Sequence, residues 1–383
     1  MVSMMIKIIV SVHDDMSESG GTTVRVRRVV RILSTKYEVM VINCSGGNQE
    51  KLRDMDDATI ITVSGIGQRL LWTKSPLIKA LSVTLWNLRL LFTLLRTRPA
   101  IVYCANDWFG FPGVYLASRI LKCKIIYEAQ SIYFEESKEL GHSGIGLRLR
   151  QALESFLIRH SHHIIALSQN TYEFYSAYNH NIDLIPVFVD DEIFKKRISK
   201  PAIGDTKLVG LIGPFDSAFN EYFLDYVDNN IERFDRRIRF LAIGRCGRMV
   251  RSDRIAYTGY LNSVADYIGH LSCLDAVLIP SRVATSGPLN KIIETMSCSL
   301  PVFTTPKGIV GLYSIEPGRD ILVFDEKDLV ERVNELIFDD RFMADIGRNA
   351  REAIERYYSK SVNENKLMGI LESVSNREEQ ILK

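Results

Sequence analysis

Residues 286–305 read SGPLNKIIETMSCSLPVFTT, which is a turn, a short helical pattern and a β-like run in direct succession. Ser286 and Gly287 suit the residue that caps a helix, and Pro288 suits its first turn. The helical pattern ends before Pro301, because proline restricts the preceding residue to extended conformations. A helix that leads this directly into a strand is typical of an α/β domain.

The same alternation of short β-branched runs and longer helical patterns extends along the whole chain. Short apolar strands separated by helices indicate parallel sheets covered on both faces, so the predicted fold class is α/β with doubly wound domains. Such domains bind ligands at the carboxyl ends of their strands. The strand candidates are 6–12, 38–44, 59–64, 100–105, 124–129, 163–168 and 183–187, then 207–213, 238–244, 255–259, 275–281, 301–305 and 320–325.

The length of 383 residues suits two domains better than one. The alternation restarts near residue 205, after a polar segment that contains proline and glycine. We therefore expect a first domain at 1–195 and a second at 205–360. A last helix at 362–383 is a candidate to cross back to the first domain.

Apolar residues make up 46% of the chain and charged residues 25%, values typical of a soluble globular protein. The net charge of +2 identifies no partner, but its distribution is uneven. From Arg69 to Lys124 there are nine basic residues and one acid, Asp107, a local excess of +8. No recognised nucleic-acid motif accompanies this charge, so nucleic acid is not an expected partner.

The six cysteines are scattered without a CxxC pair, which indicates free thiols in a reducing compartment and neither a disulfide frame nor a zinc site. The amino-terminal apolar run is interrupted by Lys7 and predicts a strand instead of a signal peptide. No uncharged run reaches the roughly 18–20 residues of a spanning helix, so an integral membrane protein is not expected.

Two glycines, Gly20 and Gly21, follow the first strand candidate and precede a helix. Glycines permit close backbone approach, and a helix start offers amides to an anion, so the turn is a candidate anion site. An ordinary strand-to-helix connection is the alternative. The spacing matches neither GxGxxG nor a P-loop, which excludes dinucleotide and Walker-type sites of those kinds.

The opening stretch has a more specific pattern, because helical spacing puts Asn290, Lys291 and Glu294 on neighbouring faces of the first two turns. The amides of Leu289 and Asn290, the helix dipole and Lys291 would hold a phosphate. Glu294 would accept hydrogen bonds from hydroxyls such as those of a ribose. The alternative is an amphipathic surface helix with a Lys–Glu pair, and spacing alone leaves both interpretations open.

Five pieces of the second half follow one another in a specific order. They are 255–260 (IAYTGY), 274–281 (LDAVLIPS), 287–296 (GPLNKIIETM), 300–305 (LPVFTT) and the glycines 308 and 311. Their order resembles the carboxyl half of retaining GT-B glycosyltransferases of family 4, also called glycosyl transferases group 1. Looser similarity extends to the Gly20–Gly21 turn and to residues 166–168 and 185–190. The resemblance implies two Rossmann-like domains facing across a cleft, with a nucleotide-sugar in the second and an acceptor in the first.

The chain departs from this family pattern at three places. Ser286 stands where the family usually has a glutamate that contacts the donor sugar. Residues 213–220 (GPFDSAFN) lack the Arg and Lys that grip the diphosphate. Gln130 stands where a histidine often occurs, and it cannot take up a proton as histidine does. The candidate replacements for the missing cations are Lys291, our first choice, Arg245 and Arg282.

By resemblance, the chain is expected to transfer a sugar from a nucleoside diphosphate sugar to a lipid-linked saccharide or another hydroxyl acceptor, with retention and without metal or other cofactor. The departures leave two alternatives, a catalytically impaired GT-B partner of an active transferase and a nucleotide-sugar epimerase. The expected catalytic residues are Ser286, Gln130 and Asp107. The expected donor-binding residues are Glu294, Lys291, Asn290, Leu289, Gly287, Gly259, Tyr260, Arg245, Gly20 and Gly21.

The apolar residues of the run 77–95 (LIKALSVTLWNLRLLFTLL) are interpreted as a core helix. The basic residues of 69–124, with those of 148–159, form a candidate patch for an anionic membrane surface. A solvated charged face is the alternative. The expected location is cytoplasmic, with peripheral attachment at the inner face of the membrane.

Overall fold

The structure is a computed structural model in which part of the chain is described. The expected domain boundary, between 195 and 205, lies outside the described part. The described residues are 6–14, 16, 21–44, 59–62, 75–139, 141, 143–190, 205–216, 218–247, 250, 252–261, 263–283 and 287–376.

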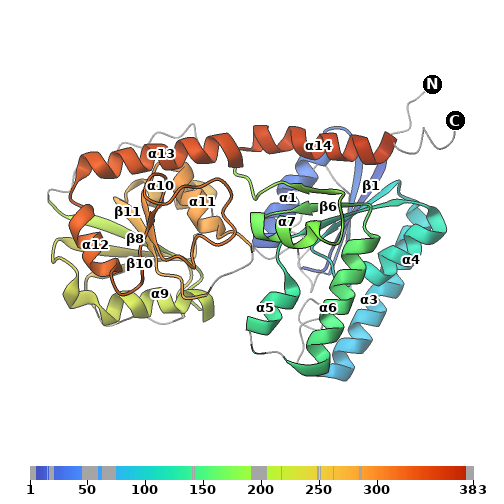
Figure 1. Cartoon of the computed structure of the whole chain (residues 1–383), viewed down its shortest axis with the longest axis horizontal. Coiled ribbons are helices and arrows are strands. Elements are labelled where there is room, and N and C mark those ends of the chain that lie inside the picture. The colour runs from blue at the N-terminus through green and yellow to red at the C-terminus, as the bar shows by residue number, and fades with distance from the viewer. Residues whose placement is uncertain are drawn as a thin grey trace. The chain divides into compact units, whose positions relative to one another are not determined.

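The chain forms two compact units (Figure 1). Unit 1 consists of residues 1–185 together with 364–383, and unit 2 consists of residues 186–363. Helix α14 (Lys360–Asn376) begins in unit 2, and its residues from Glu364 onward belong to unit 1.

The described strands of unit 1 form a parallel sheet of seven, in the order β3-β2-β1-β4-β5-β6-β7. Its central strands β1, β4 and β5 have almost wholly buried side chains, as expected for a parallel sheet covered on both faces. The bounds are β1 Lys7–Val12, β2 Glu38–Asn43, β3 Thr59–Thr62, β4 Ile101–Ala105, β5 Lys124–Ala129, β6 His163–Ala166 and β7 Ile182–Leu184.

The helices of unit 1 connect these strands, and α14 returns to them from the far end of the sequence. Helices α3, α4 and α6 run beside one another along one edge of the unit (Figure 1). The bounds are α1 Gly21–Leu33, α3 Pro76–Thr97, α4 Phe111–Leu121, α5 Tyr133–Glu139, α6 Gly144–His160 and α7 Gln169–Ser176.

The described part of unit 2 contains a parallel sheet of six strands in the order β10-β9-β8-β11-β12-β13. The strands are β8 Lys207–Ile212, β9 Ile238–Ile243, β10 Ile255–Gly259, β11 Ala276–Ile279, β12 Val302–Thr304 and β13 Leu322–Val323. Its helices are α9 Ala218–Asn229, α10 Val264–Ser272, α11 Asn290–Ser297, α12 Leu329–Leu336 and α13 Asp340–Tyr358, with a short 3-10 helix, η2, at Ile231–Arg233.

The predicted fold class is confirmed, because both units are Rossmann-like α/β domains with parallel sheets. Each predicted strand overlaps one of the strands β1–β13. The described cysteines are all free thiols, with Cys44, Cys104 and Cys123 buried and the remaining three half-buried.

The interpretation of run 77–95 as a core helix is only half right. Helix α3 does pack into the core through Trp86, Leu90 and Leu94, which are fully buried. Several of its other apolar side chains are exposed, Leu88 by 57% and Phe92 by 67% of their area. An apolar composition on several faces does not reveal which face the rest of the fold covers.

Candidate functional site

The order of strands in unit 2 defines where a ligand would bind to its sheet. Strand β8 lies between β9 and β11, so the chain runs outward from β8 in one direction and then from β11 in the other. The connections that leave the carboxyl ends of β8 and β11 therefore diverge, which is the usual position of a crevice in a doubly wound sheet. Helix α11, which carries most of the predicted donor-binding residues, follows β11.

Helix α11 begins later than the sequence predicts. Its first residue is Asn290 and its N-cap is Leu289, so Pro288 precedes the helix and the prediction of Pro288 in its first turn is wrong. The backbone of Gly311, at a φ of 85°, packs so closely on residues 287–288 that a Cβ on Gly311 would lie 2.9 Å from Pro288 N. This approach holds Gly287 and Pro288 outside the helix, and it explains why a glycine follows β12 at this point.

The side chain of Lys291 connects α11 to the carboxyl end of β8. Its Nζ donates to the main-chain oxygen of Ile212 over 2.9 Å and to Oδ1 of Asn220, and it lies 4.6 Å from the centre of the Phe223 ring. Lys291 thus reaches the segment 212–220, in which the family pattern has its diphosphate-gripping cations. Its amine is the cation that α11 brings to this part of the site.

The environment of Lys291 weakens its hold on a proton. Burial lowers the pKa of Lys291 to about 7, although the nearby Glu294 carboxylate acts in the opposite direction. Near neutral pH the amine is therefore divided between its charged and neutral forms. An anion that binds beside it would favour the charged form and raise this pKa again.

Glu294 lies one helical turn after Lys291 and is held by a neighbouring helix. The hydroxyl of Tyr267, on α10, donates to Oε2 of Glu294 over 3.2 Å. Burial and the adjacent carboxylate raise the pKa of Tyr267 well above its usual range, so this hydroxyl keeps its proton. The hydrogen bond orients the carboxylate and leaves it further acceptor capacity for ligand hydroxyls.

The ends of β8, β9 and β10 approach one another at the same edge of the sheet. Gly244, at a φ of 130°, packs on Gly213 so closely that a Cβ would lie 1.9 Å from the Gly213 oxygen. Its amide donates to Oγ1 of Thr258 over 3.3 Å. Gly259 ends β10 in a left-handed conformation at a φ of 70°, and the following Tyr260 is exposed. The predicted Gly259–Tyr260 turn is thus present at this edge.

The two arginines considered as replacement cations are both engaged within unit 2. Arg245 forms an ion pair with Asp216, with 2.5 Å between Nε and Oδ2. Arg282 donates three hydrogen bonds of 2.8, 3.0 and 3.3 Å to Glu326, and its guanidinium lies 3.8 Å from the centre of the Tyr222 ring. Either arginine would have to exchange a carboxylate partner in order to bind a phosphate. Among the described residues, the amine of Lys291 donates hydrogen bonds only to neutral oxygens, which favours it over both arginines.

In unit 1, Asp107 follows β4 and is completely buried. Its carboxylate accepts hydrogen bonds from Ser11, from the Gly110 amide at 2.8 Å and from Nε1 of Trp86 at 3.3 Å. These protein groups hold the carboxylate in place, and a catalytic role for Asp107 stays a prediction. The carboxylate organises the connections that leave β1 and β4.

His13 was not selected from the sequence, yet it is the titratable residue that Asp107 supports. Nδ1 of His13 lies 3.6 Å from Oδ1 of Asp107, and Nε2 lies 4.0 Å from Oδ1 of Asp14. Burial alone would lower the pKa of His13, but its contact with Asp107 and the charges of both aspartates outweigh burial and raise it. The only signal in the sequence was the position of His13 directly after a predicted strand.

Gln130 follows β5 and belongs to a second polar network. Its Nε2 donates to Oε1 of Glu128 over 3.3 Å, and its Oε1 accepts from the Thr22 hydroxyl over 2.9 Å. Glu128 is fully buried and forms an ion pair of 3.0 Å with Arg25 of α1. Gln130 is thereby positioned at the carboxyl edge of the unit 1 sheet, next to the start of α1 at Gly21.

Two predicted site residues, Ser286 and Gly20, lie outside the described residues, and their roles stay predictions. Of the remaining donor-site residues, Gly21 belongs to unit 1, whereas Gly259, Tyr260, Arg245 and the group at the start of α11 belong to unit 2. Within the part of the chain that the structure describes, no three acidic, histidine or cysteine side chains cluster as metal ligands.

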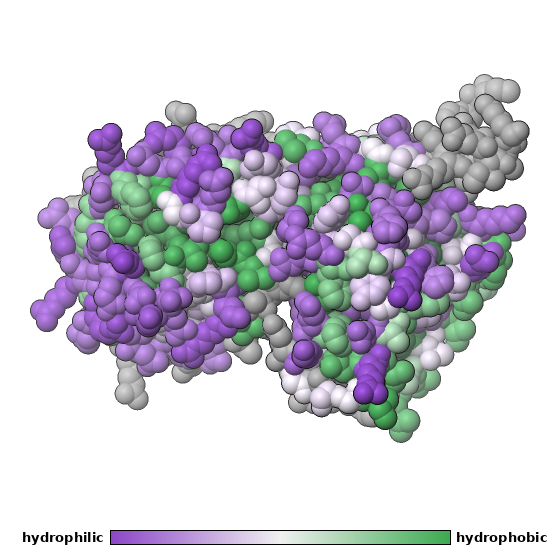
Figure 2. Space-filling view, in the orientation of Figure 1, coloured by the Kyte–Doolittle hydropathy of each residue, from purple (hydrophilic) through white to green (hydrophobic). Residues whose placement is uncertain are grey.

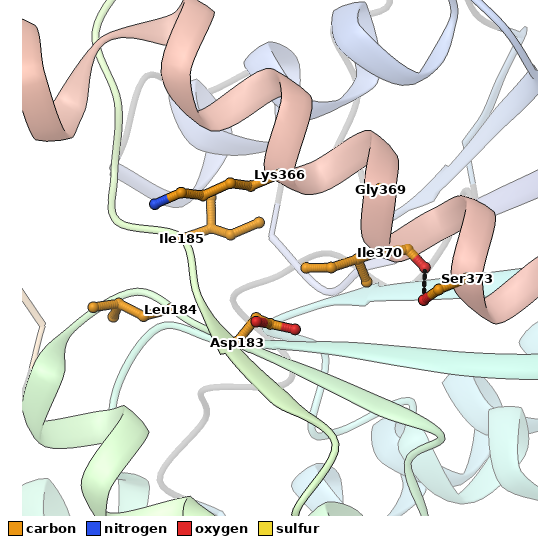
Figure 3. A pocket seen from close by; sticks show the side chains of 7 residues that line it. All are labelled: Asp183, Leu184, Ile185, Lys366, Gly369, Ile370 and Ser373. Atoms are coloured by element: carbon orange, nitrogen blue, oxygen red, sulfur yellow. Dashed lines mark hydrogen bonds between the residues drawn. The ribbon is translucent and has the colours of Figure 1, made fainter.

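A pocket of about 310 Å³ in unit 1 is separate from all the predicted site residues (Figure 3). It lies between β7 and α14, and Lys366 and Ile185 line one side of it. The carboxylate of Asp183 lies near its other end, opposite Ile370. Its lining contains neither a sheet switch point nor the start of a helix, so we do not assign it to the site.

Comparison with known families agrees with the fold. The Glycosyltransferase Family 4 model matches residues 19–193, and the Glycosyl transferases group 1 model matches residues 206–339. The first match falls mainly in unit 1 and the second lies within unit 2, while residues 1–18, 194–205 and 340–383 lie outside both matches. No curated protein sequence matches the chain.

Solved structures with the same fold are distant in sequence. HepE of Anabaena, crystallised with UDP, has a TM-score of 0.73 and 14% identity over 96% of this chain and 100% of its own. Sucrose-phosphate synthase of Thermosynechococcus elongatus has a TM-score of 0.74 and 13% identity over 96% and 99%. A glycosyltransferase of Rickettsia africae has a TM-score of 0.72 and 15% identity over 97% and 99%.

The two Rossmann-like units and these likenesses define a protein of GT-B fold. The family matches are more specific, and the chain belongs to the family 4-like, group 1 glycosyltransferases. It is a transferase of glycosyl groups.

Proposed function

We propose that the chain transfers a sugar from a nucleoside diphosphate sugar to a lipid-linked saccharide or another hydroxyl acceptor. In this reaction the bond between the anomeric carbon and the diphosphate oxygen breaks, the acceptor oxygen takes the glycosyl group, and the acceptor proton is released. Retention of configuration, a hexose as the sugar and independence of metal ions are parts of this proposal. HepE of Anabaena has been crystallised with UDP and with UDP-glucose, which supports a nucleotide-sugar donor.

The observation that carries the proposal is the arrangement of Lys291 and Glu294 at the start of α11. The first amides of an α-helix have no partner within the helix, so they and the helix dipole favour a diphosphate there. Lys291, whose amine reaches Ile212 and Asn220, would supply the positive charge that residues 213–220 lack. Stabilising the charge of the departing diphosphate is a large part of catalysis in group transfer.

Glu294 would bind the ribose hydroxyls of the donor, with Tyr267 holding its carboxylate in place. The Gly259–Tyr260 turn would lie beside the base, and the exposed ring of Tyr260 suits stacking on it. Gly287 and Ser286 would lie against the donor sugar. In unit 1, Gln130 would contact the acceptor or sugar through hydrogen bonds, and Asp107 would act by positioning His13 and the loops around it.

We further propose that the protein acts in the cytoplasm at the inner face of a membrane, where lipid-linked acceptors are presented. TarM of S. aureus, which has the same fold with a TM-score of 0.67 at 12% identity, has been crystallised as a mutant with UDP, fondaparinux and α-GlcNAc-glycerol, and this supports a saccharide as the acceptor.

The second candidate function is that of a catalytically impaired partner of an active transferase. The ion pairs of Arg245 and Arg282 favour it, because they withhold two cations from a diphosphate. An epimerase, which needs no acceptor, is a third candidate. Fold alone does not separate these functions.

Release of nucleoside diphosphate tests all three candidate functions. The purified chain is incubated with common nucleotide-sugars, with and without a membrane lipid extract, and products are identified by mass spectrometry. Acceptor-dependent release of nucleoside diphosphate together with a glycosylated lipid supports the transferase. Donor binding without turnover supports the impaired partner, and a changed sugar on an intact nucleotide supports the epimerase.

A further inference from the structure

The exposed face of α3 carries a continuous apolar stripe. At about 100° per residue of α-helix, its exposed apolar residues fall within one arc of roughly 100°. The fully buried Trp86, Leu90 and Leu94 fall on the opposite side of the helix. The stripe therefore belongs to a second apolar face that the described core does not cover. Its residues are Leu77, Ile78, Leu81, Leu85, Leu88 and Phe92.

Two neighbouring helices extend this apolar face. Helix α4 packs on α3 and exposes Leu116 and Ile120, which are four residues apart. The first turns of α6 expose Ile145 and Leu149 with the same spacing. Figure 2 shows hydrophobic side chains along the edge of unit 1 that these helices form, with hydrophilic side chains between them. We call this surface, the exposed residues of α3, α4 and α6, the three-helix face.

The charged residues of these three helices are almost all basic. They are Lys79, Arg89, Arg96, Arg119, Arg148, Arg150 and Arg159, against the single acid Glu154. The Glu154 carboxylate is turned inward, where it accepts from the amides of Tyr133 and Phe134 over 2.8 and 2.9 Å. Arg119 and Arg148 are exposed beside the apolar residues of their own helices.

We propose that the three-helix face is a membrane-docking surface that lies in the plane of an anionic bilayer. Apolar side chains would enter the boundary between headgroups and acyl chains, while the arginines between them would contact anionic headgroups. A surface whose charged residues are mostly basic fits an anionic partner. It disfavours a second copy of the same surface, because symmetric pairing would bring like charges together.

The same helix explains why docking would be peripheral. Within the described residues, Leu77–Thr97 alone has the length and apolar composition of a membrane-spanning helix, with a mean hydropathy of 1.4. Its inner face, however, forms part of the core cluster of unit 1. Crossing the membrane would expose that core, whereas lying in the interface buries only the outer face. This inference stands on the surface of unit 1 and does not depend on the proposed reaction.

The test is flotation of the full chain with vesicles of phosphatidylcholine alone or with about a third phosphatidylglycerol, at low and high salt. We expect binding to the anionic vesicles that weakens as salt increases. Replacing Leu81, Leu88 and Phe92 together by serine is expected to reduce the partition coefficient at least about tenfold, since apolar burial drives insertion. Unchanged melting temperature and circular dichroism would show that this variant is folded, and the single variant Leu88→Ser provides a milder test.

Replacing Arg96, Arg119 and Arg148 by glutamine is expected to abolish the preference for anionic vesicles. The matched controls, Val264→Ser and Arg341→Gln, change exposed residues of unit 2 and should bind like the unaltered chain. The proposal is overturned if the unaltered chain does not float with anionic vesicles. It is also overturned if the serine variant and the glutamine variant both float with anionic vesicles as well as the unaltered chain does. A third outcome would overturn it, namely that the three-helix face holds two chains together. Sedimentation without lipid would then give a lower mass for the serine variant than for the unaltered chain.

Discussion

The amine of Lys291 lies 2.9 Å from the main-chain oxygen of Ile212, the last residue of β8. This contact joins the start of α11 to the end of the central strand of unit 2. It brings the amine beside residues 213–220, and our proposal that Lys291 supplies the positive charge missing from that segment rests on this position.

Because burial lowers the pKa of Lys291 to about 7, we expect diphosphate binding to depend on pH. A bound diphosphate raises this pKa, so binding takes up a proton, and affinity falls by up to about tenfold per pH unit between pH 7 and 9. Isothermal titration with a nucleoside diphosphate across this range measures the effect. In Lys291→Met the affinity should be lower and nearly independent of pH.

Lys307→Met is the matched control, since Lys307 is an exposed lysine of the same unit. It should retain the pH dependence of the unaltered chain. A pH-dependent affinity that persists in Lys291→Met would show that another group takes up the proton.

Tyr267→Phe removes the hydroxyl that holds Glu294 and leaves the rest of the ring in place. The net value of one such hydrogen bond predicts an affinity for nucleoside diphosphate about three- to tenfold lower. The loss of affinity should be much smaller for the 2′-deoxynucleotide. Tyr267 orients the Glu294 carboxylate for the ribose hydroxyls, and the 2′-deoxynucleotide lacks one of them. Equal losses for both nucleotides would argue that Tyr267 acts elsewhere.

His13 should contribute stability that depends on pH. Its pKa is raised in the folded state, so its stabilisation is fully present below the unfolded value of 6.5 and is lost as the pH rises through the folded value. The melting temperature of His13→Gln should therefore fall further below that of the unaltered chain at pH 6 than at pH 8.5. The exposed His180→Gln serves as control, and a difference that stays constant across this range would contradict the assigned pairing with Asp107.

Arg25→Met should be strongly destabilising, because it leaves the buried Glu128 carboxylate without its cation. Removing one partner of a buried ion pair typically costs about 3–5 kcal/mol. Adding Glu128→Gln to the same chain removes the uncompensated charge and should recover much of the lost melting temperature. If the double variant melts no higher than the single one, the cost comes from lost packing of Arg25 and not from charge.

The fold was readable from the sequence because parallel strands covered on both faces are short apolar runs, and helices separate them regularly. The position of α11 could be predicted only to within two residues, since its start depends on the packing of Gly311 against Pro288. That contact joins segments which no local pattern connects.

The polar networks of unit 1 were hidden for the same reason. His13 and Asp107 follow different strands, and only the pairing of β1 with β4 brings the two connections together. The exposed stripe of α3 was missed because an apolar helix shows its two faces only when the elements packed on it are known.

The most direct test of the central claim is titration of nucleoside diphosphates into the unaltered chain and into Glu294→Ala. Because the variant lacks the charged Glu294 carboxylate as a hydrogen-bond acceptor, its affinity for nucleoside diphosphate should be about ten- to a hundredfold lower. We expect saturable binding of at least one nucleoside diphosphate to the unaltered chain and this loss of affinity in Glu294→Ala. Absent binding, or equal affinity in both proteins, would contradict a nucleotide-sugar site at the start of α11.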